Sequence, residues 1–409
     1  IVTTFAPGDF AILAVNNNNS NNVDEIAFVV FKPIAAGTSF YMTDNGYERV
    51  NAGQWGGTEG VVKLTYTGAA VGGVAAQAGS VFVIQGNDAS FNILRCGVSD
   101  NGNWTIVPRA LFPSGSFYFN LNSEDQVWFT QGGDWTSASA SASSHDAITD
   151  GRVLYGWTGI DWKPNIGTSP TPATWTTRGS RLYPQMGCFS TNLGLAVDIG
   201  RYKYIGPTTA ATRLAWISRI NDVSNWASYA SNALYDGAPI NYATALGFPC
   251  PFVINPGVPV DGKWTGSKST DWFDCANWDT REVPDATMGV VIDNINATRP
   301  CVVDNVTNAT NAIQYGNAAN CFNLTVNGTL PNGLLSTGNP LDVINVNGNF
   351  LLTGGATLDM TGGGVFNLQS GTWTRTASNF VSGAGTVSYN SPAAQNIVAE
   401  DYFNLASTS

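Results

Sequence analysis

Charged side chains are scarce in this 409-residue chain, and their scarcity excludes several kinds of protein. They make up 11% of the residues, against about 25% in an average soluble protein. Only 18 residues are lysine or arginine, against 29 aspartates and glutamates, so we expect no basic surface for nucleic acid. The single histidine, His145, argues against a histidine-based zinc site and against most catalytic triads.

Long apolar runs are missing as well. No run of 18 apolar residues occurs, so we expect no insertion into a membrane. The chain also lacks an alternation of strand and helix patterns, which argues against a parallel α/β sheet. Because 43% of the residues are hydrophobic and aromatic residues are plentiful, the chain is nevertheless expected to fold.

Short runs of β-branched and aromatic residues between Gly, Asn and Pro predict an all-β protein. In the first part of the chain they predict strands at Phe10–Val15, Ile26–Phe31, Ser39–Met42, Val61–Tyr66, Ser80–Ile84, Ser116–Asn120 and Gln126–Thr130. One helix is predicted at Ala210–Tyr229, because Leu214, Ile217 and Ile220 follow helical spacing. These elements favour a β-sandwich-like domain.

A proline-rich stretch divides the chain. We predict an N-terminal β-rich domain over residues 1–250, a linker over 251–262 and a second domain over 263–409. The second domain begins with three closely spaced tryptophans. It continues with short strands, among them Cys301–Val303, Val343–Val346 and Thr386–Tyr389, separated by Gly/Asn turns.

Such spacing is typical of a β-solenoid, in which stacked Asn or Thr side chains can hydrogen-bond from coil to coil. Gly and Asn tolerate the positive φ angles that its corners require. A second antiparallel sandwich remains the alternative.

Six cysteines permit three disulfides or a set of buried thiols, and the sequence leaves both open. We hypothesise the pairs Cys96–Cys188, Cys250–Cys275 and Cys301–Cys321. Neutral polar residues replace charges over much of the chain, and the six lysines are few. The chain begins at Ile1 without a methionine or a charged leader, so we expect an extracellular protein whose signal peptide has been removed.

Two stretches resemble large secreted, repeat-containing surface proteins and adhesins of Bacteroidetes. The first comprises residues 7–11, 24–29, 34–38 and 41–46, ending with Leu214–Ile217 and Asn225–Trp226. The second is the tryptophan-rich stretch 264–284 with the strands that follow. The resemblance implies a structural role at the cell surface and brings no catalytic residues with it.

Carboxylates offer few candidates for chemistry. Asp44 and Asp100, each followed by Asn-Gly, are calcium candidates, although a simple turn explains them as well. No other cofactor is expected. The pairs Asp24–Glu25 and Glu124–Asp125 are interpreted as solvated strand edges rather than as the two carboxylates of a glycosidase. His145 and Asp146 lie in a Ser/Ala-rich stretch without a nucleophile elbow.

The tryptophans and asparagines offer binding candidates. Trp264, Trp272 and Trp278 are predicted to close the apolar end of the solenoid, and a sugar-stacking platform is the alternative. Seven Asn-x-Ser/Thr sites are candidates for glycosylation: Asn18, Asn103, Asn296, Asn305, Asn308, Asn323 and Asn327.

The end of the chain shows no capping segment, and an uncapped solenoid invites strand addition from another chain. We therefore predict a non-enzymatic surface protein that assembles head to tail with copies of itself into a filament. Ile1, Val2 and Phe5 would supply the assembly strand. A glycan-binding adhesin stalk that recognises surface polysaccharide is the first alternative, and a carboxylate-dependent hydrolase is the second.

Overall fold

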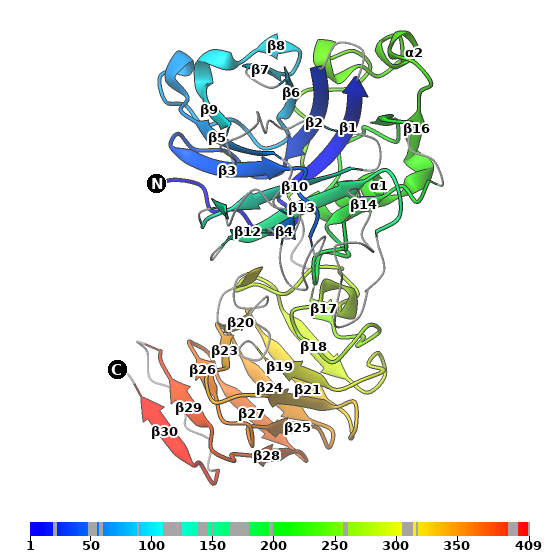
Figure 1. The fold of residues 1–409 in the computed structure, drawn as a ribbon. Helices are drawn as coiled ribbons and strands as arrows, with labels where there is room; N and C mark the ends of the chain where they lie inside the picture. The colour runs from blue at the N-terminus through cyan, green and yellow to red at the C-terminus, as the bar shows by residue number, and fades with distance from the viewer. Residues whose placement is uncertain are drawn as a thin grey trace. The chain divides into compact units, whose positions relative to one another are not determined.

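A computed structural model describes residues 1–18, 23–47, 55–56, 60–87, 90–108, 121, 125–133, 135–137, 145–148, 151–162, 180–195, 199–256, 261–304, 314–315, 318–391 and 400–407. The chain forms two compact units, Ile1–Pro256 and Gly257–Ser409, and strands dominate both (Figure 1). The predicted all-β fold is confirmed. The strand predicted at Ser116–Asn120 lies outside the described residues.

The first unit contains two large sheets. One has the order β16 (Trp226–Ser228), β15 (Arg201–Tyr204), β1 (Phe10–Asn18), β2 (Val23–Val30), β6 (Val81–Asn87), β7 (Ser90–Arg95) and β8 (Val98–Ser99). The other has the order β14 (Ser190–Asn192), β13 (Arg152–Thr158), β10 (Gln126–Gln131), β3 (Thr38–Thr43), β5 (Val61–Tyr66) and β9 (Trp104–Pro108). A small sheet joins β11 (Trp135–Ser137), β12 (His145–Ile148) and β4 (Trp55–Gly56).

Aromatic rings fill the space between the two large sheets. Phe10 of β1 contacts Phe40 of β3 and Phe129 of β10, with ring centroids 5.0 and 5.2 Å apart. Phe82 of β6 meets Trp104 of β9 edge to face at 5.3 Å. Because all five side chains are buried and come from both sheets, they form the core of a β-sandwich.

The predicted helix is shorter than its apolar pattern indicated. Helix α1 spans Arg213–Asn221 and is capped by Thr212, whose hydroxyl accepts a hydrogen bond from the Ala215 N–H. Beyond it, Asp222 caps the short helix η3 (Val223–Asn225), and β16 then pairs with β15. The remaining short helices of the unit are η1 (Ala69–Val71), η2 (Asn101–Asn103), α2 (Asn232–Asp236) and η4 (Tyr242–Thr244).

Much of the expected linker belongs to the folded units. Phe252 is buried against Trp216 of α1, and its N–H donates to the oxygen of Gly79. Gly262 and Lys263 form β17, the first strand of the second unit. The boundary therefore falls after Pro256, and the first half of the proline-rich stretch is packed on the sandwich.

The second unit is a parallel β-solenoid with three sheets, as predicted in preference to a second sandwich. The first sheet contains β17 (Gly262–Lys263), β18 (Val290–Asp293), β21 (Leu324–Asn327), β24 (Phe350–Thr353) and β27 (Trp373–Thr376). The second contains β19 (Cys301–Val303), β22 (Leu334–Thr337), β25 (Thr357–Asp359) and β28 (Asn379–Val381). The third contains β20 (Ala318–Cys321), β23 (Val343–Val346), β26 (Val365–Leu368), β29 (Thr386–Tyr389) and β30 (Asn404–Ser407).

Alternating side chains fill the interior of the solenoid. Leu324 lies beside Phe350, and Phe350 lies beside Trp373, so equivalent positions of successive coils stack on one another. At a corner, Gly354 adopts a φ of 66°, and a Cβ there would lie 2.1 Å from Oδ1 of Asn327. This explains why the sequence pattern is short apolar runs separated by Gly and Asn.

Candidate binding groove, first coil and solenoid edge

The expected assembly strand, Ile1–Phe5, is divided between surface and core. Ile1 and Val2 are exposed, whereas Phe5 is fully buried and its ring contacts those of Phe10 and Phe40. Arg152 of β13 donates a 3.0 Å hydrogen bond to the Phe5 carbonyl. Phe5 is therefore part of the sandwich core rather than of a free strand, which corrects the prediction for this residue.

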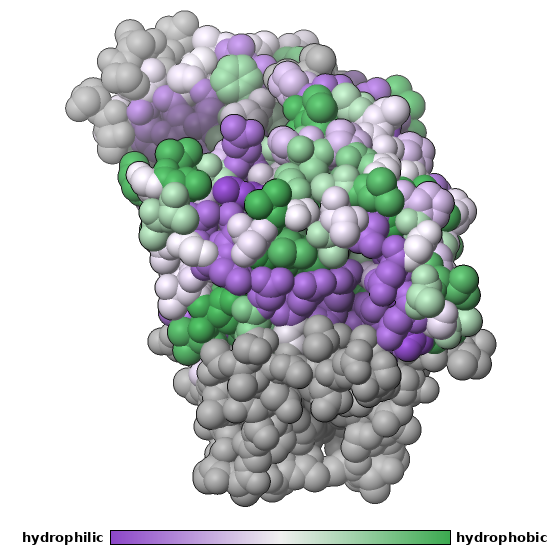
Figure 2. All heavy atoms as spheres, turned by 90° about the horizontal axis from the view of Figure 1, so that it is seen from above, coloured by the Kyte–Doolittle hydropathy of each residue, from purple (hydrophilic) through white to green (hydrophobic). Residues whose placement is uncertain are grey.

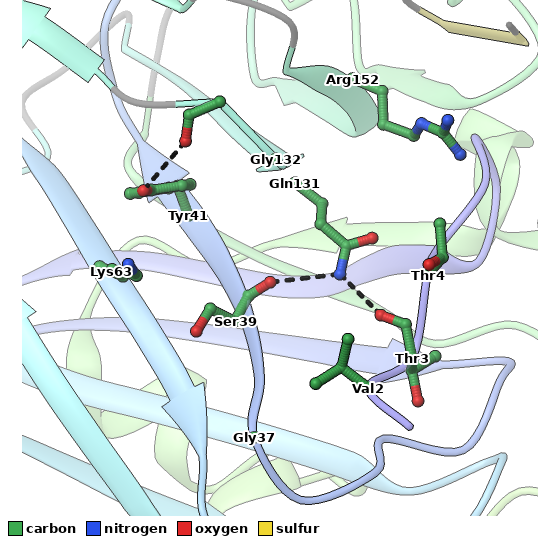
Figure 3. Close-up of a pocket in the computed structure, with 11 residues that line it drawn as sticks. Val2, Thr3, Thr4, Gly37, Ser39, Tyr41, Lys63, Gln131, Gly132 and Arg152 are labelled. Carbon is green, nitrogen blue, oxygen red and sulfur yellow. Dashed lines mark hydrogen bonds between the residues drawn. The ribbon is translucent and has the colours of Figure 1, made fainter.

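The side chain of Gln131, at the end of β10, fastens this segment to β3 (Figure 3). Its Nε2 donates to the carbonyl oxygens of Thr3 and Ser39, at 2.9 and 3.2 Å, and its Oε1 accepts from the Phe5 N–H at 2.6 Å. The β10–β3 ladder ends at the pair Thr130–Tyr41. The amide of Gln131 thus occupies the place that a direct ladder between β3 and the segment would fill.

An open groove of about 430 Å³ lies over this amide. Its walls include Val2 and Thr3 of the N-terminal segment, Ser39 of β3 and Gly133. Lys63 of β5 and Arg152 of β13 also line it, and Figure 3 shows them on opposite sides of Gln131. The described lining thus carries two cations and no carboxylate, in a chain whose net charge is −11.

Asp9 is a buried carboxylate that interacts electrostatically with the cations near the groove. Burial raises its pKa, and Arg213, 3.8 Å from its Oδ1, opposes that shift, with Lys32 and Arg152 acting in the same direction as Arg213. The Nζ of Lys32 also donates to the Thr4 carbonyl at 2.7 Å. Three cations thus interact with one carboxylate, and Lys63 adds a fourth positive charge beside the groove.

The three tryptophans lie in the first coil of the solenoid. Trp278 packs edge to face against both Trp264 and Trp272, at centroid distances of 5.1 and 4.9 Å. Its indole N–H donates to the Trp272 carbonyl, and that of Trp264 donates to the Arg299 carbonyl, each at 2.8 Å. The short helix η5 (Cys275–Asn277) precedes Trp278.

Asn277 holds the loop between these rings. Its Oδ1 accepts from the N–H groups of Lys268 and Ser269, and its Nδ2 donates to the Asp271 carbonyl. A bridge between Asp271 and Val302 then continues the parallel stacking onto β19. All three tryptophans are at most 1% exposed, so the sugar-stacking alternative is wrong, and their position favours closure of the apolar end.

In the described part of the chain, the end strands of the three sheets belong to two successive coils, because β30 stacks on β29. β27, β28 and β30 each stand at the end of their sheet in the described part of the chain (Figure 1). Val381 of β28, Leu405 of β30 and Phe403, which directly precedes β30, are exposed. An end strand that carries exposed apolar side chains is the combination that strand addition uses.

The cysteine pairing differs from the hypothesis. Cys96 is bonded to Cys250, with Cα atoms 5.4 Å apart, so Cys96–Cys188 and Cys250–Cys275 are both wrong. Cys188 and Cys275 are also disulfide-bonded. Cys301 and Cys321 are free thiols buried in the solenoid, and burial raises the pKa of both. The alternative of buried thiols therefore applies to this last pair.

The two calcium candidates serve as internal hydrogen-bonding groups. Asp100 forms an ion pair with Arg95 at 3.1 Å and accepts from Asn103 and from the indole of Trp104, each at 2.8 Å. Asp44 is fully buried, and its backbone oxygen accepts from the side chain of Gln126. Within the described ranges, no three His, Cys, Asp or Glu side chains are grouped so that they could hold a metal ion.

The acidic pair on β2 is buried rather than solvated. Asp24 accepts from the Leu121 N–H at 2.6 Å. Glu25 accepts from the Tyr235 hydroxyl and from Nε2 of Gln85, at 2.9 and 2.8 Å. The expectation of a solvated strand edge is therefore wrong for Asp24 and Glu25, and Asp125 is buried too.

Three of the residues considered for catalysis fall wholly or partly outside what the structure describes. Glu124 lies outside the described residues. His145 and Asp146 lie in β12, paired with Gly56 and Trp55 of β4, and their side chains are not described. His145 and Asp146 therefore lie in a strand and not in the loop that the sequence predicted.

The glycosylation candidates differ in exposure. Asn296 is exposed, and its Nδ2 donates to both carboxylate oxygens of Asp293 at 2.9 Å. Asn103 is buried and bonded to Asp100, so a glycan cannot be attached there without disrupting the fold. Asn323 and Asn327 are half-buried. Asn305, Asn308 and the side chain of Asn18 lie outside the described residues.

Hydrophobic and hydrophilic residues are interspersed on the face drawn in Figure 2. The exposed large hydrophobic side chains of the first unit include Val74, Val98 and Leu246. Scattered residues of this kind are normal on protein surfaces, so they do not mark a docking site. In the described ranges, no helix is long and apolar enough to cross a membrane.

Comparison with protein-family models, with curated proteins and with solved structures gives no match. The resemblance to surface proteins of Bacteroidetes therefore stays a prediction.

Proposed function

We propose that this chain is a secreted, non-enzymatic structural protein of a cell surface that assembles head to tail with copies of itself. The observation that supports the proposal is the set of end strands of the solenoid, β27 and β28 with β30 one coil further on, each of which has a neighbour on one side in the described part of the chain. The Cys96–Cys250 disulfide agrees with an oxidising extracellular setting.

The register of the solenoid determines what can add to these end strands. All strand pairs of the three sheets are parallel and in register, from β17 to β30. An added strand would satisfy the free N–H and C=O groups of an edge and would cover Phe403 and Leu405. A contact between two different surfaces of the same protein propagates into a filament when its rotation does not close a ring.

The segment Ile1–Thr4 is the partner strand in this proposal. It forms no helix or turn, and Ile1 and Val2 are exposed. The Thr3 N–H donates to Oγ1 of Thr38, and its carbonyl accepts from Gln131, so the Thr3 backbone is turned toward its own unit. In an extended chain the backbone groups of Val2 then point to the opposite side, where a second copy can pair with them.

The test is assembly of the purified protein at high concentration, followed by light scattering and negative-stain electron microscopy. We expect the wild type to form filaments with a one-subunit repeat, and the double variant Val381→Lys, Leu405→Lys to remain monomeric because charge at an edge opposes strand addition. Ile295→Lys, which changes an exposed apolar residue between β18 and β19, is the matched control and should still assemble.

Thermal unfolding of each variant separates loss of assembly from loss of folding. A wild type that stays monomeric at every concentration contradicts the proposal. So does a double variant that assembles as well as the wild type while unfolding at the same temperature.

A further inference from the structure

We propose that the groove over Gln131 binds a carboxylate-bearing saccharide, with Lys63 and Arg152 as the residues that recognise the acid group. The groove shares Val2, Thr3 and Thr4 with the segment proposed as the partner strand and contains none of the solenoid edge strands, so ligand binding by the monomeric protein tests this inference separately from assembly.

Two cationic side chains line the groove. Lys63 and Arg152 flank the groove on opposite sides (Figure 3), and no carboxylate is present among its described lining residues. The Nζ of Lys63 lies 5.7 Å from the ring centroid of Tyr41, and this cation–π contact helps to hold the ammonium group beside the groove. Both cations line this space, and although Arg152 donates to the Phe5 carbonyl through one nitrogen, a guanidinium group carries five N–H donors in a planar arrangement that suits a carboxylate.

The remaining lining is polar and uncharged. Thr3, Thr4 and Ser39 bring hydroxyl groups to the lining, those of Thr3 and Ser39 being hydrogen-bonded to the Pro33 carbonyl and to Thr65, and Gly132 and Gly133 are exposed. At about 430 Å³, the groove has the size of a small-molecule site. Hydroxyl and carbonyl groups around a pair of cations match the hydroxyls and carboxylate of a sugar acid.

An acidic peptide fits the same groove less well. A peptide that binds as an added strand needs free backbone groups along one wall. Here the carbonyls of Thr3 and Ser39 already accept from Nε2 of Gln131, and its Oε1 accepts from the Phe5 N–H. Ser39 is also paired with Thr65 of β5. The backbone is therefore occupied, and side chains are what the groove offers to a ligand.

The experiment is calorimetric titration of the purified protein with oligogalacturonate at low ionic strength. The same oligomer in its fully methyl-esterified form serves as the neutral probe, because it keeps the sugar and removes the charge. We expect the acid form to bind and the ester not to bind. Lys63→Gln should weaken binding about tenfold, the size of one lost charged hydrogen bond.

Lys268→Gln is the control, because Lys268 is an exposed lysine of the second unit and should bind the oligomer as the wild type does. Polyglutamate is the third probe, and binding as tight as that of oligogalacturonate would mean that the groove recognises charge alone, which overturns the assignment to a saccharide. Absence of binding, equal binding of the acid and ester forms, or equal weakening by both lysine variants would also overturn it.

Discussion

The side-chain amide of Asn345 donates a 2.9 Å hydrogen bond to Oδ1 of Asn320, its in-register neighbour one coil earlier. Asn367 repeats this bond to Asn345 at 2.9 Å, and Asn390, which directly follows β29, donates to Asn367 at 3.2 Å. The four asparagines form a ladder along the third sheet, as the expectation of stacked Asn side chains predicted. Each internal amide both donates and accepts, so the loss of one removes a hydrogen bond from each of two neighbours.

Removal of an internal amide should therefore destabilise the solenoid. For Asn345→Ala we expect a loss of about 1–3 kcal/mol in the free energy of unfolding. Chemical denaturation followed by circular dichroism measures it. Asn294→Ala is the control, since its exposed side chain makes one long bond of 3.5 Å. Equal stability of the two variants would contradict a structural role for the ladder.

The packing of the first coil predicts a larger effect at Trp278. Because this ring contacts both Trp264 and Trp272 and is almost fully buried, Trp278→Ala should cost about 3–5 kcal/mol. Trp278→Phe keeps part of the aromatic contact and should cost less. Unfolding in denaturant measures both variants. A loss below about 1 kcal/mol for the alanine variant would mean that the cap contributes little.

The buried thiols make a prediction about chemical reactivity. Burial raises the pKa of Cys301 and Cys321, so at pH 8 both stay protonated and shielded from reagents in the folded protein. We expect no labelling by a thiol-specific reagent under native conditions and labelling of both residues after unfolding without reductant. Mass spectrometry of the digested protein identifies the labelled positions, and rapid labelling of either cysteine in the native state would contradict their placement.

Buried tyrosines predict how stability changes at high pH. Burial raises the pKa of Tyr204 to about 12 and also raises the pKa of Tyr235 and Tyr242. The phenols ionise in the unfolded chain near pH 10. A raised folded-state pKa gives stability that is present below pH 10 and is lost as the pH rises toward 12.

Lys203 acts in the opposite direction, because burial lowers its pKa and the folding penalty on its ammonium disappears as the pH rises. Since three tyrosines oppose one lysine, we expect a net loss of stability between pH 10 and 12. Tyr204→Phe should reduce that loss, and denaturation curves at pH 7, 10 and 12 measure it. An unchanged pH slope in Tyr204→Phe would contradict the assignment.

Local chemistry allowed many elements to be predicted from the sequence. The bounds of Val61–Tyr66, Cys301–Val303, Val343–Val346 and Thr386–Tyr389 agree with the observed strands, because the alternation of buried and outward residues is written in the sequence itself. The helix was predicted too long, since Asp222 ends it locally and Trp226–Ser228 pairs with β15, a distant strand. The helical spacing of apolar residues carries no information about this pairing between two strands.

The sequence by itself determined the strands, the division into two domains and the asparagine ladder, because each depends on neighbours that are close in the chain or repeat along it. The tertiary structure decided the rest. Cys96 pairs with Cys250 across 154 residues, and the groove brings Lys63 and Arg152 together from β5 and β13. Such proximity results from sheet topology and burial, and neither is encoded in the spacing of residues along the chain.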